Sequence, residues 1–159
     1  MSEPYEEIIG GETLTRAAPG PRHERICAWL HHRVGASLGD GSVSRLLTPR
    51  SVTQFGPGTI LRPDLSVVTA ATGKLWLAVE IVNPEDHRMD TVVKKTIYEE
   101  HKAPRLWMVD PRYDNVEIYH STPYGLALKG ILAGKETVEE ALLPQFGCTV
   151  AELFAADSV

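Results

Sequence analysis

Hydrophobic and polar positions follow two periods along this chain, and each change of period marks a predicted element. Short alternating runs at 5–9 and 12–16 flank a glycine pair, which predicts a small β-hairpin. From Pro21 onward the apolar residues recur at helical spacing, and proline suits the first helical position. We therefore expect a first helix that ends near Gly35 or Gly39.

The middle of the chain has the pattern of β-strands. Segments 42–47 and 51–55 are β-like, and glycines and a proline break the chain after them. Segments 65–69 and 75–82 are strongly apolar, as strands with both faces covered would be. The turn at Gly73-Lys74 between them predicts a second hairpin.

After Asn83-Pro84 the period returns to 3.6, which predicts a second helix that Pro104 ends. Segment 105–110 is again a buried strand, so strand 75–82, the helix and this strand form a β-α-β unit with parallel strands. The remaining predicted elements are a hairpin from 116–119 and 124–128 and a helical turn at 150–154. The pattern predicts an α/β fold with a mixed sheet.

Length and charge limit the classes of function. A chain of 159 residues suits one domain, which we assign to 1–159. The net charge of -5 gives no overall attraction to nucleic acid phosphates, so binding there needs a local basic patch. Arg22, Arg25, His32 and Arg33 could form such a stripe on the first helix, and an ordinary solvated face is the alternative. Arg62 is a further candidate for nucleic-acid binding.

The start of the chain is acidic, without the basic and apolar regions of a signal peptide, and no apolar run approaches membrane length. These features predict a cytoplasmic protein with no membrane partner. Cys27 and Cys148 have no metal-ligand spacing and fit reduced or buried thiols. The strand at 116–119 could offer an edge for pairing, and a homodimer is the favoured oligomer.

Two carboxylates occupy positions where a charge is costly. Glu80 lies inside the most apolar run, and Asp64 stands immediately before another apolar strand. Burying an ionised carboxylate costs several kcal/mol unless it is paired or binds a metal. The two acids suggest one divalent cation. The alternatives are an ion pair of Glu80 with Arg62 or Lys94, and a simple turn role for Asp64.

These residues belong to a longer ordered set of motifs. The set comprises Arg62-Pro63-Asp64, Glu80-Ile81-Val82-Asn83-Pro84, Asp90 with Lys94 and Tyr98 at spacings of four, and Trp107-Met108-Val109-Asp110-Pro111. In this order they resemble the bacterial family called Uma-two, whose members are labelled as candidate restriction endonucleases. The arrangement is similar to the PD-(D/E)xK restriction endonuclease-like core of helix, three strands, helix and strand, here with an N-terminal and a C-terminal hairpin added.

The resemblance implies a nuclease that cuts nucleic acid, DNA in the first place, with a Mg²⁺ or Mn²⁺ cofactor. Its implied catalytic residues are Asp64, Glu80 and Lys94, and its metal ligands are Asp64, Glu80 and the backbone carbonyl of Ile81. Val82 stands where the broader superfamily has a lysine, so Lys94 of the following helix would orient or deprotonate the water and stabilise the developing charge. Accessory candidates are Glu12, Glu24, His23 and Tyr98. The competing hypothesis is a catalytically inactive module that binds nucleic acid or protein.

Overall fold

The computed structural model describes residues 2–39 and 42–158, and its elements follow the predicted order closely. In chain order they are β1 (Tyr5–Ile9), β2 (Glu12–Arg16), α1 (Pro21–Ser37), β3 (Ser44–Leu46), β4 (Thr53–Gln54), β5 (Ile60–Leu61), β6 (Leu65–Thr69), β7 (Leu75–Ile81), η1 (Pro84–Asp86), η2 (Met89–Lys94), α2 (Lys95–Glu100), β8 (Arg105–Asp110), β9 (Asn115–Thr122), β10 (Gly125–Ala133), β11 (Thr137–Val138), β12 (Cys148–Thr149), α3 (Val150–Phe154) and η3 (Ala155–Ser158).

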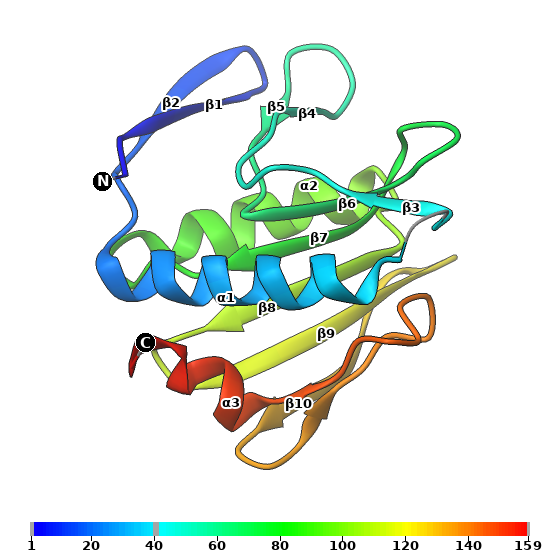
Figure 1. Cartoon of the computed structure of the whole chain (residues 1–159). Coiled ribbons are helices and arrows are strands. Elements are labelled where there is room, and N and C mark those ends of the chain that lie inside the picture. Colours follow the sequence, from blue (N-terminus) through cyan, green and yellow to red (C-terminus); the bar gives the residue numbers. More distant parts are fainter. Residues whose placement is uncertain (1, 40–41, 159) are drawn as a thin grey trace.

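A six-stranded mixed sheet forms the centre, in the order β10-β9-β8-β7-β6-β3. Strands β7 and β8 are parallel, as the β-α-β pattern predicts, and the other neighbours are antiparallel. Figure 1 shows α1 across one face of this sheet and α2 on the other. The fold therefore confirms the predicted α+β architecture with a mixed sheet.

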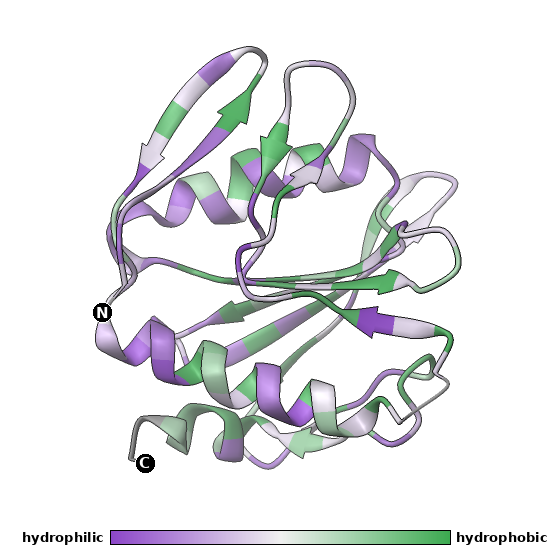
Figure 2. Cartoon of the chain, turned by 45° about the horizontal axis from the view of Figure 1, so that its top comes forward, coloured by the Kyte–Doolittle hydropathy of each residue, from purple (hydrophilic) through white to green (hydrophobic). Residues whose placement is uncertain are grey.

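Alternation along β7 divides its side chains between two hydrophobic layers. Leu77, Val79 and Ile81 belong to the layer that includes the buried face of α1, whereas Ala78 and Val82 belong to the layer that includes α2. In Figure 2 hydrophobic green runs along the middle strands, while α1 alternates between purple and green. Because residues two apart share a face, Glu80 points to the α2 side.

A second, four-stranded sheet has the order β2-β1-β5-β4 and lies beyond one end of the central sheet (Figure 1). The hairpin of β1 and β2 has the predicted boundaries, and its register places Tyr5 opposite Arg16. Its link to β5 is one residue pair, Ile8 with Ile60. Most of what holds the hairpin against the core is therefore side-chain contact.

The second helix differs from the prediction of one continuous helix. It consists of a 3₁₀ turn, the π-helical segment η2 and the short helix α2. The side chain of Asn83 accepts a hydrogen bond from the Glu85 N–H and starts the first turn. Asp90 and Lys94 of η2 are both buried and both make ion pairs, which outweigh the poorer backbone geometry of a π-helix.

The edge predicted at 116–119 is also wrong, because β9 is paired on both sides by β8 and β10. On this side of the sheet the edge strand is β10, where an irregularity in the pairing between Leu128 and Gly130 and the exposed Lys129 interrupt a regular pairing surface. The homodimer therefore loses the edge that motivated it and stays a prediction. No helix in residues 2–39 and 42–158 has the length and apolar character needed to cross a membrane.

Candidate active site

Asp64 lies immediately before β6 and is 3% exposed. Its Oδ2 accepts a hydrogen bond from the Ile81 N–H at 2.8 Å, and its Oδ1 accepts one from Arg50 Nη1 at 3.2 Å. Burial alone would raise the pKa of this carboxyl, but the charge and hydrogen bond of His23, with help from Lys94, lower the pKa below its usual value. Asp64 is therefore ionised at neutral pH.

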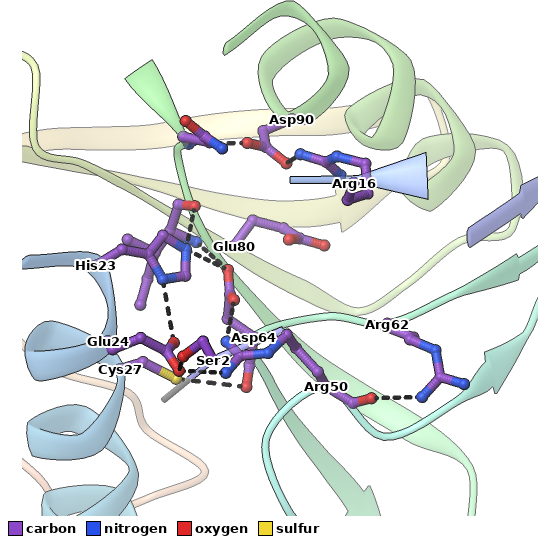
Figure 3. Close-up of polar contacts among 12 residues, drawn as sticks. Ser2, Arg16, His23, Glu24, Cys27, Arg50, Arg62, Asp64, Glu80 and Asp90 are labelled. Atoms are coloured by element: carbon purple, nitrogen blue, oxygen red, sulfur yellow. Dashed lines mark hydrogen bonds and ion pairs between the residues drawn. The ribbon is translucent and has the colours of Figure 1, made fainter. Parts of the chain in front are cut away.

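His23 is placed by the first turn of α1 so that its ring faces both Asp64 and the end of β7 (Figure 3). Its Nε2 lies 3.1 Å from the Ile81 carbonyl oxygen and 3.4 Å from Asp64 Oδ2. A carbonyl only accepts, so Nε2 carries a hydrogen in this arrangement. Burial lowers the pKa of His23, yet Asp64 and Glu24 raise it above the ordinary value.

Glu80 is 1% exposed and has a different set of partners. Its Oε2 accepts a hydrogen bond from the Tyr98 hydroxyl and lies 2.7 Å from Lys94 Nζ. Burial raises the pKa of Glu80 to about 8, because the attraction of Lys94 is opposed by Asp64 and two other nearby carboxylates. The predicted ion pair with Lys94 is present, and Arg62 is not a partner of Glu80.

The π-helical segment explains how Asp90, Lys94 and Tyr98 all face inward. An α-helix advances about 100° per residue, so positions four apart drift by about 40° and positions eight apart by about 80°. A π-helix has more residues per turn, so its residues advance less and part of this drift is taken back. Lys94 ends the π-helical segment, and its side chain has no exposed surface.

Glu7 of β1 is the principal residue that the sequence analysis missed. It is fully buried, and its Oε2 lies 2.8 Å from Lys94 Nζ and accepts the Arg62 N–H at 2.7 Å. Arg16 of β2 pairs with Glu7 at 2.7 Å and with Asp90 at 3.0 Å. The hairpin thus brings one carboxylate, of Glu7, and one guanidinium, of Arg16, into the site. Strand alternation could have shown that Glu7 shares a face with Tyr5, but not what that face contacts.

The other predicted site residues differ in their surroundings: some are exposed, and others make contacts within the protein. Glu12 is exposed in the β1–β2 hairpin, and no contact among the described residues brings it to Asp64 or Glu80. Arg25 is exposed on α1, whereas Arg22 donates to the Pro111 carbonyl and to Asp114. Arg62 donates to the carbonyls of residues 6 and 50. The basic stripe expected on α1 is therefore partly used in internal contacts.

The charged groups form two neighbouring sets. We call Asp64, His23, Arg50 and the Ile81 carbonyl the Asp64 side, and Glu80, Lys94, Glu7 and Tyr98 the Glu80 side. Glu24 adjoins the first through Arg50 at 2.7 Å, and Asp90 adjoins the second through Arg16. We call the acidic residues of both sets and the two adjoining acids the carboxylate cluster. It comprises Glu7, Glu24, Asp64, Glu80 and Asp90.

The donor set of the Asp64 side suits a divalent cation. Neighbouring ligands of an ion bound at about 2.1 Å lie about 3 Å apart, and His23 Nε2 has this spacing from both the Ile81 carbonyl oxygen and Asp64 Oδ2. No group of three His, Cys, Asp or Glu side chains within the described ranges converges as a metal site. An ion bound here would therefore need the Ile81 carbonyl oxygen as one of its ligands. Among the described residues, the five carboxylates of the cluster outnumber the three Arg and Lys side chains that pair with them, Arg16, Arg50 and Lys94, and a proton on Glu80, whose pKa is raised to about 8, offsets part of this difference.

A mixed sheet between two helical layers, with one acid before a strand, a second inside the next strand and a lysine from the following helix, defines the restriction endonuclease-like class of nuclease folds. The chain belongs to the Uma2 family, whose description is "Putative restriction endonuclease" and whose model matches residues 2–151. The family predicted from the sequence motifs is therefore confirmed.

The structure is similar to the crystal structure of "a putative nuclease belonging to DUF820" from Anabaena variabilis, with a TM-score of 0.81. The two chains are 16% identical, and the match covers 98% of this chain and 93% of the other. At this identity the likeness establishes the fold, and the chemistry rests on the residues. No match was found among curated proteins.

Proposed function

We propose that the chain is a nuclease that hydrolyses phosphodiester bonds of nucleic acid with one Mg²⁺ or Mn²⁺ ion. The observation that carries this proposal is the convergence of Asp64 Oδ2, the Ile81 carbonyl oxygen and His23 Nε2 beside the buried Glu80. These groups and Glu80 would hold the ion, and carboxylate and carbonyl oxygens favour Mg²⁺ or Mn²⁺. When bound, the ion would neutralise charge on the attacked phosphate and lower the pKa of a water.

The residues of the Asp64 side have distinct duties in this proposal. Asp64 supplies a permanent negative charge, because its pKa is lowered. Arg50 holds the other carboxylate oxygen and fixes its direction. Once His23 gives up its Nε2 hydrogen, the same nitrogen becomes a lone-pair donor toward the point where Asp64 and the Ile81 carbonyl already converge.

Lys94 contacts the carboxylate of Glu80, and its proposed role is to position that carboxylate. Burial lowers its pKa, but Glu80, Glu7 and Asp90 raise the pKa well above the ordinary value, so the amine is protonated and is no general base. Its side chain has no exposed surface and would not touch a substrate. We assign Lys94 to fixing the charge and direction of Glu80, as a positioning residue. The water-orienting role that the resemblance implies stays a prediction.

Calorimetric titration with Mn²⁺ tests this proposal without knowledge of the substrate. We expect one site in the wild type that is lost in Asp64→Asn and strongly weakened in Glu80→Gln and His23→Gln. Glu12→Gln is the matched control, because Glu12 is an exposed acid outside the cluster. Plasmid DNA, single-stranded DNA and RNA are then incubated with each protein, and cutting should require both the ion and Asp64.

A catalytically inactive binding module is the second candidate. Arg16, Arg50 and Lys94 already pair with the carboxylate cluster, so the cluster has a structural use without any metal. Failure of the wild type to bind Mn²⁺, together with no cutting of any of the three nucleic acids, would favour this function. Saturable binding that Asp64→Asn abolishes would exclude it.

A further inference from the structure

A cavity of about 320 Å³ adjoins the Asp64 side of the site. Its walls include Pro21, Pro84, Pro111, Ala17 and Ala18, from segments at the start of α1 and at the carboxyl ends of β7 and β8. The carboxyl ends of parallel strands are where open α/β sheets place their ligands. At this size the cavity is at the lower end of the range for small-molecule sites and holds one compact group.

The lining combines rigid apolar surface with a few polar groups. Three prolines and two alanines offer flat, uncharged contact, His23 and Asn83 supply polar groups, and the charged Arg22 and Glu85 complete the wall. His23 belongs both to this lining and to the Asp64 side, where its ring contacts Asp64 and the Ile81 carbonyl (Figure 3). A group seated in the cavity would therefore lie directly beside the atoms proposed to act on a phosphate.

Most arginines of this chain already have internal partners, which argues against electrostatic binding of a duplex. Within residues 2–39 and 42–158, ion pairs with carboxylates already engage six of the ten arginines: Arg16, Arg22, Arg33, Arg50, Arg105 and Arg112. Arg62 donates to backbone carbonyls. Proteins that track the duplex backbone neutralise many phosphates with free basic side chains, and this chain has a net charge of -5.

From the cavity and the committed arginines together, we propose that this cavity receives one unpaired nucleotide, so that the substrate is a single strand or an open end and not an intact duplex. This inference rests on the proposed nuclease function and names its substrate class. The apolar walls take the face of the base, the polar groups take its edge, and the adjoining phosphate lies toward His23 and Asp64. A base paired within a duplex is shielded from such a cavity, because its face is stacked and its edge is bonded.

The test measures binding of short fluorescent single strands of DNA and RNA, and of a blunt duplex of the same sequence, with Ca²⁺ in place of Mn²⁺. Gels verify that the probes stay intact. We expect a single strand to bind at least about tenfold more tightly than the duplex. The logarithm of its affinity should fall with the logarithm of salt at a slope of only about -1 to -2, as for one to three neutralised phosphates.

Ala18→Leu fills the cavity, and Ala36→Leu on the exposed surface of α1 is the matched control. Both positions are exposed, so neither change disturbs a packed core. Ala18→Leu should weaken single-strand binding about tenfold and leave Mn²⁺ binding intact, while Ala36→Leu should change neither. Duplex binding as tight as single-strand binding, or unchanged binding in Ala18→Leu, would overturn the inference.

Failure of this inference can be told apart from failure of the proposed function. Asp64-dependent cutting of duplex plasmid with no effect of Ala18→Leu would overturn the inference and leave the nuclease intact. A wild type that binds neither Mn²⁺ nor any of the probes would overturn both.

Discussion

Asp64 and Glu80 are buried carboxylates of one cluster, yet their pKa values move in opposite directions. The carboxylate of Asp64 contacts Arg50, His23 and a backbone N–H. These contacts stabilise its ionised form by more than burial destabilises it. Glu80 shares a single ammonium with Glu7, which leaves one negative charge too many on that side. The comparison teaches that the count of compensating donors, and not the depth of burial, decides which acid stays ionised.

Removal of the shared ammonium should have the largest effect. In Lys94→Met the carboxylates of Glu7 and Glu80 lose their common partner in a site without solvent, and we expect a loss of about 3 to 5 kcal/mol in unfolding free energy. Chemical denaturation measures this. Lys95→Met is the control, because that partly exposed ammonium lies over the Tyr119 ring, a contact worth about 1 kcal/mol. Equal losses in the two variants would contradict the shared-ammonium account.

The opposite pKa shifts predict how stability depends on pH. Glu80 has a pKa of about 8 in the folded state against 4.5 ordinarily, so the folded state holds the extra proton between these values and stability falls as pH rises through this window. His23, whose pKa is also raised, acts in the same direction, because its contribution is present below 6.5 and is lost as pH rises through the folded-state pKa. We expect the melting temperature to fall by roughly 5 to 10 °C between pH 5 and pH 8.

Three variants sharpen this pH test. Glu80→Gln cannot ionise, so most of the pH dependence should disappear. In Glu7→Gln the Lys94 ammonium has Glu80 as its one remaining ion-pair partner of the two. The pKa of Glu80 should then be lower, and stability should depend less on pH. Asp64→Asn should also reduce the slope above pH 5, because the charge of Asp64 raises the pKa of both Glu80 and His23. A melting temperature that rises across this window would refute the proposed difference between the two sides.

The Tyr98 hydroxyl provides the smallest expected effect. It donates to Glu80 Oε2, so Tyr98→Phe removes one hydrogen bond to a buried acid and should cost about 1 to 2 kcal/mol in unfolding free energy. Tyr124→Phe, at a fully exposed position, should cost nothing measurable. Thermal melting of both variants side by side measures the difference, and equal stability of the two would remove Tyr98 from the Glu80 side.

The sequence was sufficient for features that local pattern decides. Proline and apolar spacing placed α1, alternation placed β6 and β7, and the cost of a charge in an apolar strand singled out Glu80. The structure brings Lys94, one of the two ion-pair partners considered for Glu80, and the accessory candidate Tyr98 to within contact of that carboxylate. Their part in catalysis stays a prediction.

Features that depend on tertiary contact could not be predicted in this way. Glu7 and Arg16 reach the cluster because the hairpin packs on the core, and nothing in their own segment shows which surface it meets. Glu12 was an accessory candidate that the family resemblance implied, and that resemblance does not show whether the side chain is buried; in the structure it is exposed. The π-helical segment is likewise set by the ion pairs of Asp90 and Lys94, which span the fold.

That π-helical segment has a consequence for how related chains should be aligned. Met89–Lys94 contains more residues per turn than an α-helix, so its 6 residues turn through the same total angle as about five residues of an α-helix. Loss of one residue there with a return to α-helical geometry would therefore leave Tyr98 in nearly its present direction relative to everything upstream. A gap of a single residue at this point of an alignment would look like a break in the site, yet the residues that follow it would still face the cluster.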